Sequence, residues 1–398
     1  MMPKVAGLKL YELDLPFRHP FRHAARSRTH SRSLFMRCVT DDGHTGYGET
    51  LPRPYVTGET QQSAFDLLAQ RILPRLVGRP FASFEQLQAF LADCDGKAPH
   101  DWVPPGTPQT AAWCVVDLAL LDAFGRSFDR NLDAAYRAAR DPTGAPWPRR
   151  LGFSAVVSSD MGWRTTATLL KVRLYGIRDV KVKVAGGSLR GVRLARRILG
   201  RAAHLRIDGN MGWTFDQARR SMARLAELGV EVVEQPLPSS DLDGMARLLA
   251  TTQLALMADE AFHDADSLAR LAALRACTAV NVRIAKCGGL TAALARCREA
   301  LQEGLTLQIG CHVGETSQLA AAQLVLVRAL GGNIAHLEGC YGKHLLALDP
   351  VSPILQFGRR GRPPALPVGA GLGTEVDESM VERFAGRRIA FGVLREVA

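Results

Sequence analysis

The chain has 398 residues, of which 47% are hydrophobic and 22% charged, a composition typical of a globular protein with a sizeable core rather than a disordered chain. No run approaches the roughly 20 apolar residues that a membrane span needs, and residues 1–10 contain no stretch of secretory length. We therefore expect a cytoplasmic protein without a membrane partner. The eight cysteines are scattered and form no C-x-x-C pair, which argues against a zinc knuckle or a disulfide framework.

The formal net charge of +11 at pH 7 comes almost entirely from arginine, and much of the excess is local. Between residues 17 and 32 the chain contains Arg18, Arg22, Arg26, Arg28, Arg32, His19, His23 and His30. A basic arm for nucleic acid is one interpretation of this segment. Because aromatic residues are sparse here and the segment runs directly into a hairpin pattern, we favour a loop that faces a small anion and expect no nucleic-acid partner.

The first 135 residues combine strand patterns with helical periodicity. Strands are expected at 8–15, 34–39 and 44–49, the last two joined by an Asp-Asp-Gly turn. Apolar residues recur at helical spacing over 60–76, 83–91 and 109–138. These elements predict an α+β domain over residues 1–135.

Residues 141–150 are rich in Pro and Arg, and we place a domain boundary there. Repeated βα units of about 25 residues then predict an α/β fold, a (β/α)8-type, TIM-like barrel over residues 145–354. A doubly wound sheet is the alternative, but no Gly-rich phosphate turn follows Val157. The C-terminal segment, 355–398, is expected to return to the N-terminal domain. The eight β-rich runs are 151–157, 179–184, 204–208, 230–234, 254–259, 279–284, 305–309 and 333–338.

Five of the predicted strands end on a charged residue at a regular interval. The residues are Lys183, Asp208, Glu234, Asp259 and Arg283, at spacings of 25, 26, 25 and 24. Barrel enzymes carry their chemistry at the carboxyl ends of the strands. We therefore expect these five side chains to form a ring around one mouth of the barrel.

Asp208, Glu234 and Asp259 are carboxylates that follow apolar runs on adjacent strands. Three convergent carboxylates repel one another unless a cation lies between them, and hard oxygen ligands suit Mg²⁺ or Mn²⁺. The alternative is that each carboxylate caps the helix that follows it. Three such residues in register favour the metal site over the caps.

Lys181 and Lys183 point to one face of their strand because side chains alternate with period two. Lysine is rare in this chain, with only eight among the 50 basic residues, so an inward-facing pair is unlike a solvated charge run. A buried lysine near other cations loses proton affinity and becomes a usable base. A metal-bound carboxylate stabilises the charge that builds up as the α-proton leaves, so the set fits carbon-acid chemistry.

The motifs resemble the enolase superfamily, specifically its muconate-lactonising and mandelate-racemase branches. In chain order they are Lys181-Val182-Lys183, Asp208-Gly209-Asn210, Glu234-Gln235-Pro236, Asp259-Glu260 and Lys286-Cys287-Gly288-Gly289-Leu290. The resemblance implies that Lys183 is the base and Lys181 its electrostatic partner. It also implies that Asp208, Glu234 and Asp259 bind the metal, while Asn210 and Glu260 are further candidates for catalysis or for support of the site.

The same resemblance makes the N-terminal module a capping domain, with GHTGYGE at 43–49 and YVTGE at 55–59 in the places that the family leads one to expect. The arginine-rich segment would then overhang the substrate. Its candidates for substrate contact are Arg22, Arg26 and Arg28.

The chain departs from both branches at the sixth barrel strand. Arg283 stands where the muconate-lactonising branch has a second lysine facing the base. Arginine stays protonated, so it is a fixed cation and a poor proton acceptor. His312 stands near the histidine of the mandelate-racemase branch but lacks that branch's aspartate. Glu338, within His336-Leu337-Glu338, falls where dipeptide epimerases have an Asp-x-Asp pair, so a cationic substrate amine is not favoured.

One base on one face favours a reaction that uses Lys183 twice, namely muconate-cycloisomerase-like cycloisomerisation or syn elimination of water from an acid. Racemisation or epimerisation requires Lys286 or His312 to reach the opposite face. A non-catalytic, anion-binding barrel is the interpretation from a different class. We expect a small-molecule carboxylate as the partner, while the oligomeric state stays open, with a homo-oligomer as one option by analogy.

Overall fold

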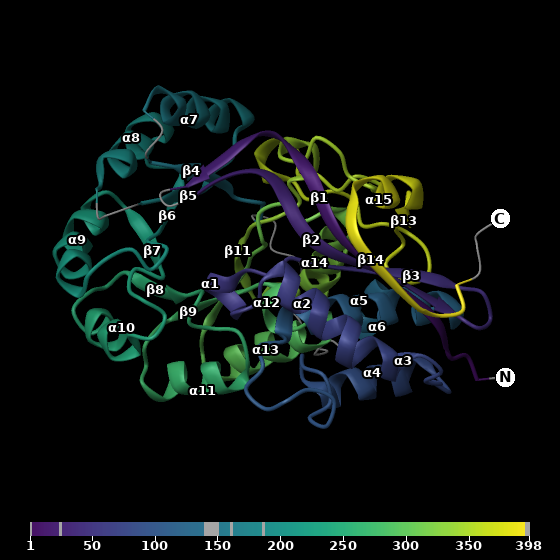
Figure 1. Cartoon of the computed structure of the whole chain (residues 1–398). Helices are drawn as coiled ribbons and strands as arrows, with labels where there is room; N and C mark the ends of the chain where they lie inside the picture. The colour runs from purple at the N-terminus through teal and green to yellow at the C-terminus, as the bar shows by residue number, and fades with distance from the viewer. Residues whose placement is uncertain (1, 24–25, 139–150, 160–161, 185–187, 395–398) are drawn as a thin grey trace.

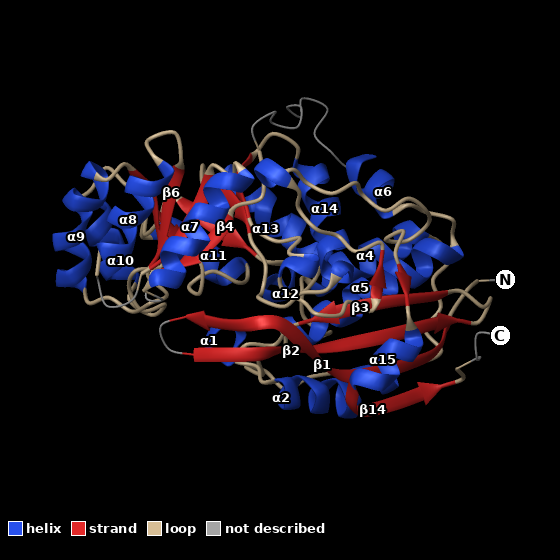
Figure 2. Ribbon diagram, turned by 90° about the horizontal axis from the view of Figure 1, so that it is seen from above, coloured by secondary structure: helices blue, strands red, loops and turns tan. Residues whose placement is uncertain are grey.

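The computed structural model describes residues 2–23, 26–138, 151–159, 162–184 and 188–394 (Figure 1). The predicted boundary at 141–150 lies outside these residues. An antiparallel sheet with its helices forms one part of the molecule, and parallel strands surrounded by helices form the other (Figure 2). Within the described ranges, no helix combines the length and the apolar character needed to cross a membrane.

The antiparallel sheet has the strand order β14-β1-β2-β3. Its members are β1 (Val5–His23), β2 (Arg26–Thr40), β3 (Thr45–Thr50) and the C-terminal strand β14 (Ala385–Gly392). β14 pairs with β1, so this C-terminal strand lies at the edge of the N-terminal sheet. The helices of this part are α1 (Pro54–Thr57), α2 (Gln61–Leu67), α3 (Leu73–Leu76), α4 (Phe84–Cys94), α5 (Thr110–Ser127) and α6 (Leu132–Ala138), with a π-helical turn at Leu68–Ile72.

The arginine-rich segment is not the loop that the sequence suggested. β1 and β2 continue through it as a long hairpin in which Phe21 lies opposite Arg28. Leu15 and Phe17 are buried in a small cluster with Leu346, so the alternation of the strand extends beyond residue 15. Figure 2 shows this β-arm extending past β3 and β14 toward the barrel. The pairing of β1 with β2 therefore directs the arginine-rich end of the hairpin toward the barrel.

The parallel strands β4 to β11 follow one another in chain order. The first and last are linked where the Ser154 amide donates to the Leu337 carbonyl at 2.8 Å, beside a parallel bridge between Phe153 and Leu337. This arrangement confirms the predicted (β/α)8-type barrel. The strands are β4 (Ala155–Ser158), β5 (Asp179–Lys183), β6 (His204–Asp208), β7 (Val230–Glu234), β8 (Ala255–Ala258), β9 (Ala279–Val282), β10 (Thr306–Ile309) and β11 (Ile334–Leu337).

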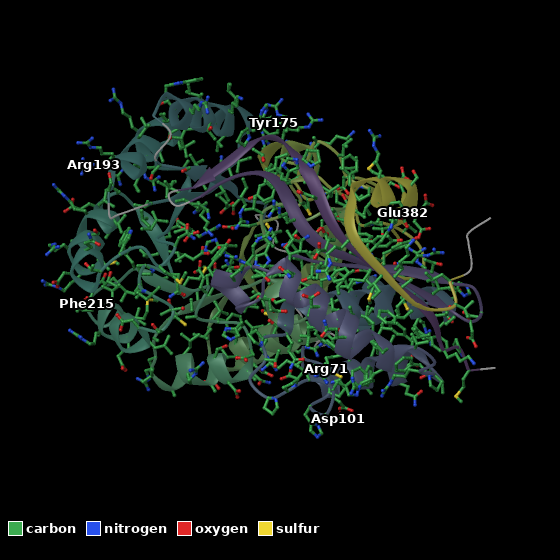
Figure 3. All side chains as sticks on the ribbon, viewed as in Figure 1. Arg71, Asp101, Tyr175, Arg193, Phe215 and Glu382 are labelled. Carbon is green, nitrogen blue, oxygen red and sulfur yellow. The ribbon has the colours of Figure 1, made fainter. Side chains whose placement is uncertain are left out.

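Helices alternate with these strands and form the outer layer of the barrel (Figure 1). They are α7 (Trp163–Tyr175), α8 (Arg190–Leu199), α9 (Phe215–Glu227), α10 (Leu242–Leu249), α11 (Ala265–Ala273), α12 (Ile284–Cys287), α13 (Leu290–Gln302) and α14 (Ser317–Leu330). α8 presents several arginines outward, and Arg193 lies at the periphery in Figure 3. Part of the net positive charge is therefore on this solvated helix surface. Two short strands, β12 (Val351–Ser352) and β13 (Glu375–Val376), and helix α15 (Glu378–Phe384) precede β14.

Glycines allow the close approach of β3 to α5. A Cβ on Gly46 would lie 2.0 Å from the Ala123 amide nitrogen, and one on Gly48 would lie 2.2 Å from the Val115 carbonyl oxygen. No side chain fits at either position without moving the backbone of the helix. Gly46 and Gly48, two of the three glycines of GHTGYGE, therefore serve the packing of the cap.

The Gly-Gly pair after the sixth strand lies at a contact between the barrel and the cap. Gly288 has φ +93°, and a Cβ there would lie 2.1 Å from the Gly96 carbonyl oxygen. Gly289 has φ +118° and packs on the side chain of Asp117, whose carboxylate accepts a 2.8 Å hydrogen bond from the Leu290 amide. Only glycine combines this conformation with this proximity.

Candidate functional site

The structure brings the regularly spaced charged residues together at one end of the barrel. Strand register aligns Lys183 with Asp208 and Asp208 with Glu234. Asp259 directly follows β8, and Arg283 directly follows β9. The regular repeat arises because each βα unit returns the chain to the same end of the barrel.

Lys181 is buried among three carboxylates. Its Nζ lies 2.7 Å from Glu234 Oε1, 3.0 Å from Asp208 Oδ2 and 3.4 Å from Glu338 Oε2. Burial lowers the pKa of Lys181, but the three carboxylates outweigh burial and raise that pKa well above its ordinary value. Lys181 is therefore a permanent cation, which suits the role of electrostatic partner and not that of base.

Lys183 faces the open end of the barrel. Its side chain is 18% exposed, and its Nζ lies 3.5 Å from Asp208 Oδ2 and 3.4 Å from the amide oxygen of Asn210. These contacts are longer than those of Lys181. The ammonium group of Lys183 is consequently held loosely and remains accessible from the mouth.

Arg283 faces the site from β9, the sixth barrel strand, whereas Lys183 is on the second. Its guanidinium forms an ion pair with Asp259 and lies 4.0 Å from Glu234 Oε1. Burial lowers the pKa of Arg283, but Asp259 and other carboxylates raise this pKa by more than burial lowers it. The guanidinium therefore stays charged. The side of the site opposite Lys183 thus carries a fixed cation.

Lys286 does not face the reacting side of the barrel, contrary to one option from the sequence. Its Nζ donates to the Asp259 carbonyl at 2.7 Å, to Asp259 Oδ1 at 3.0 Å and to the Asn281 carbonyl at 2.7 Å. The side chain is completely buried. Three acceptors use all three ammonium protons, so Lys286 holds Asp259 from behind and cannot serve as a second base in this arrangement.

Polar residues deeper in the barrel were missed by the sequence reasoning as members of the site. Arg206 donates to Glu338 Oε1 at 2.8 Å and to Ser154 Oγ at 3.0 Å. Two amide side chains, Asn281 and Gln308, donate to the Glu234 carboxylate at 2.9 and 3.2 Å. The sequence does contain an indication of these residues. Arg206 stands two positions before Asp208, and Asn281 two positions before Arg283, so each points to the same face of its strand as that residue of the ring.

His312 lies beyond β10 and is buried. Within the described part of the chain, neither ring nitrogen has a hydrogen-bond partner. Burial and then the cations Arg283, Arg53, Lys286 and Arg28 lower the pKa of His312 well below its ordinary value, so the ring is neutral. Its backbone amide donates to Glu315 at 2.5 Å.

Of the three arginines expected to contact substrate, only Arg28 has a described side chain. Its guanidinium lies over the ring of Tyr55, 5.9 Å from the centroid. The backbones of Arg22 and Arg26 belong to the hairpin, and their side chains lie outside the described residues. The structure adds Arg53, which the sequence reasoning did not single out.

The carboxylates supply oxygen donors for a divalent cation. Asp208, Glu234 and Asp259 are buried, and Glu260 Oε2 accepts no hydrogen bond from described residues. Burial, and then Asp259 and Asp208, raise the pKa of Glu260 to about 8. Among described residues, no three acidic, histidine or cysteine side chains converge as a metal cluster, and Lys181 and Arg283 form ion pairs with Glu234 and Asp259. The donor set fits Mg²⁺ or Mn²⁺ chemically.

The chain matches two adjoining sequence families. Residues 7–133 match the mandelate racemase / muconate lactonizing enzyme N-terminal domain, and residues 165–380 match the enolase C-terminal domain-like family. An L-Ala-D/L-Glu epimerase of Clostridium acetobutylicum is 26% identical over 82% of this chain and 87% of the relative. A chloromuconate cycloisomerase of Cupriavidus pinatubonensis is 28% identical over 94% and 96%.

Solved structures agree on the fold. A dipeptide epimerase of Cytophaga hutchinsonii, crystallised with Mg and the dipeptide D-Ala-L-Val, has a TM-score of 0.83 at 22% identity, covering 98% of this chain and all of that one. The matched segments span the cap and the barrel that carry the site. The protein therefore belongs to the mandelate racemase / muconate lactonizing enzyme family of the enolase superfamily.

Proposed function

We propose that the protein removes the α-proton of a small carboxylate substrate with Lys183 as the single base, through an enolate intermediate. The observation that carries the proposal is the contrast among the lysines. Lys183 is open to the mouth, whereas Lys181 and Lys286 are locked by buried oxygen acceptors. Among the described lysines of the site, Lys183 alone is both partly exposed at the mouth and held by long contacts.

Asp208, Glu234 and Asp259 would hold Mg²⁺ or Mn²⁺, and the ion supplies electrostatic stabilisation for charge that develops on the substrate carboxylate. Lys181 balances the buried carboxylates Glu234 and Asp208. Lys286 fixes the orientation of Asp259 through its three hydrogen bonds. Arg283 keeps a positive charge on the side opposite the base.

A base on one face supports a muconate-cycloisomerase-like reaction, in which the same lysine acts twice. The likeness to a chloromuconate cycloisomerase over nearly the whole chain agrees with this choice. Syn elimination of water from a hydroxy acid uses the same geometry and is the lyase alternative. A non-catalytic anion-binding barrel is disfavoured by the open Lys183 beside buried acids.

Epimerisation is the second candidate, and a specific observation favours it. Both ring nitrogens of His312 lack a hydrogen-bond partner among the described residues, so one of them is free to face a substrate. Burial and the neighbouring cations lower the pKa of His312, which makes the ring a weak base. Several of the relatives are epimerases or racemases. In this case His312 and Lys183 would act on opposite faces.

The test is incubation in D₂O with Mg²⁺ and a panel of unsaturated diacids, hydroxy acids and N-acyl amino acids, followed by mass spectrometry and proton NMR. We expect deuterium uptake or product formation that is lost in Lys183→Ala and retained in Lys171→Ala, an exposed lysine on α7. Uptake that survives in Lys183→Ala and disappears in His312→Gln would reject the single-base proposal. No turnover or exchange with any member of the panel would count against the proposed class.

A further inference from the structure

Helix α7 carries apolar side chains on two opposite faces. Its inner face buries Leu169 and Val172 where the helix packs on the barrel. Its outer face exposes Trp163, Leu170 and Leu174, to 76%, 47% and 76%. The two leucines follow Trp163 by about two and three turns of helix, so the three side chains form one stripe. A helix on the outside of a barrel needs only one apolar face, and contiguous exposed apolar side chains mark an interaction surface.

Basic side chains flank this outer stripe on both sides. Each residue advances about 100° around the helix axis, which places Lys171 on one side of the stripe and Arg173 on the other. Arg164 lies over the ring of Trp163, with its guanidinium 5.7 Å from the centroid. The apolar stripe is therefore bordered by cations along its length.

The neighbouring helix α8 extends the positive surface. It packs beside α7 at the edge of the barrel (Figure 1), and Arg193 lies at the periphery in Figure 3. Asp179 is the only acid in the sequence from residue 162 to residue 204, and it belongs to β5. The exposed basic residues of the two helices are Arg164, Lys171, Arg173, Arg190, Arg193 and Arg197. Together with the outer stripe they form what we call the α7–α8 face.

The positive charge of the α7–α8 face is not balanced by neighbouring acids. None of its six basic residues forms an ion pair with a carboxylate of the described chain. On the next helix the pattern differs, because Arg219 and Arg224 of α9 pair with Asp216 and Glu227. The α7–α8 face therefore combines exposed apolar side chains with uncompensated positive charge.

This combination decides which kind of partner the face fits. A second copy of the chain is disfavoured, because a two-fold contact through the stripe would bring two basic flanks together. Nucleic acid would use the cations but leave Leu170 and Leu174 in water. An anionic lipid surface uses both features, since its phosphates attract basic side chains while tryptophan and leucine enter the boundary between headgroups and acyl chains.

We propose that the α7–α8 face binds the surface of an anionic lipid bilayer, with Trp163, Leu170 and Leu174 inserted at the level of the headgroups. The basic side chains of both helices then lie against lipid phosphates. The sequence predicts no membrane partner because it lacks a membrane span, but a contact in the plane of the surface requires no span. This inference is independent of the reaction that the barrel catalyses.

The test is cosedimentation of the full chain with vesicles of phosphatidylcholine alone and of phosphatidylcholine mixed with an equal amount of phosphatidylglycerol. We expect the mixed vesicles to bind at least about tenfold more tightly, and added salt to weaken this binding. Lys171→Gln and Arg193→Gln should each weaken it about fivefold, which is the contribution of one basic side chain near an anionic surface. Arg219→Gln on α9 is the matched control and leaves binding unchanged.

The apolar stripe is tested separately. Trp163→Ser and Leu174→Ser should each weaken binding about tenfold, whereas Leu274→Ser, an exposed leucine at the end of α11, should have no effect. The fluorescence emission should shift to shorter wavelength when mixed vesicles are added, and Trp163→Phe should lose this shift while it keeps binding. All these side chains are exposed, so circular dichroism and the melting temperature should match those of the unmodified protein.

Equal affinity for the two kinds of vesicle, or binding that survives in Trp163→Ser and Leu174→Ser, overturns the proposal. Light scattering that shows a dimer, lost in Leu174→Ser, with no binding to mixed vesicles would assign the stripe to a second copy of the chain. A DNA duplex bound through Lys171 and Arg193, again without vesicle binding, would assign the cations to nucleic acid. Either of these two results also rejects the lipid surface.

Discussion

The three lysines at the barrel mouth differ in how their ammonium groups are held, and this difference decides which of them can move a proton. Lys181 contacts three carboxylates, Lys286 satisfies three oxygens, and Lys183 has two long contacts and partial exposure. A proton acceptor must lose its own proton and reach the substrate. The sequence places all three lysines near the site, and the structure adds the partners that hold each of them.

Replacing Arg283 by lysine should introduce a second titratable group opposite Lys183. Lysine can lose its proton, whereas arginine stays protonated. We expect Arg283→Lys to exchange the α-proton of both enantiomers of a chiral substrate, and Arg283→Gln to lack this gain. Chiral chromatography after incubation in D₂O measures the effect, and unchanged stereochemistry in Arg283→Lys would contradict it.

Lys286→Met should destabilise the fold. The substitution leaves the buried Asp259 carboxylate without the cation behind it, and breaking one partner of a buried pair costs about 3–5 kcal/mol. Urea unfolding should show this loss of unfolding free energy, with Lys171→Met unchanged within about 0.5 kcal/mol as an exposed control. A loss below about 1 kcal/mol would mean that Asp259 finds other partners.

At the scale of elements, the cap and the barrel meet through α5, which packs against β3 on one side and contacts α12 and α13 on the other. Glycines permit both contacts with α5: Gly46 and Gly48 from the sheet, and Gly289 from the barrel. The sequence motifs that contain these glycines were assigned to their elements correctly. The reason for a glycine at these positions is the close approach of segments that are distant in the chain. This approach is visible only in the tertiary structure.

Gly48→Ala should loosen the attachment of β3 to α5. The added methyl group would lie 2.2 Å from the Val115 carbonyl oxygen, and forced overpacking costs about 1–3 kcal/mol. Gly386→Ala on β14 is the matched control, because its nearest contact would be 4.0 Å away. A melting temperature of Gly48→Ala equal to that of Gly386→Ala would contradict this explanation of the motif.

At the scale of the molecule, burial at the junction of cap and barrel keeps carboxyl groups protonated. The pKa of Glu49 is raised to about 8 by burial, against an ordinary value of 4.5. The unfolded chain loses this proton near pH 4.5 and the folded chain only near pH 8. The contribution of Glu49 to stability is therefore complete below pH 4.5 and is lost as the pH rises to 8.

Glu49→Gln should flatten the fall of stability with pH across this window, because glutamine does not ionise. The substitution should reduce the slope of unfolding free energy against pH by at most about 1.4 kcal/mol per pH unit. Urea unfolding at a series of pH values from 4.5 to 8 measures it. Glu227→Gln, an exposed site on α9, should leave the slope as in the unmodified protein.

Divalent cation binding should stabilise the whole molecule. A ligand that binds only the folded state at a hundred times its Kd adds about 2.7 kcal/mol to the unfolding free energy. We expect Mg²⁺ or Mn²⁺ to raise the melting temperature, and Asp208→Ala to remove this rise. A melting temperature that responds equally in both proteins, or in neither, would contradict the assignment of Asp208, Glu234 and Asp259 as ligands.

The sequence by itself determined the barrel, its cap and the residues that end each strand, because a repeat of one strand and one helix returns the chain to the same edge. It did not reveal the β-arm, whose strands pair over a distance that no local pattern encodes. Nor did it decide whether Lys286 reaches the opposite face of the site, or show that Glu338 is engaged by Arg206. These outcomes depend on contacts between residues far apart in the chain, and only the tertiary structure decides which charges meet and which remain open to a substrate.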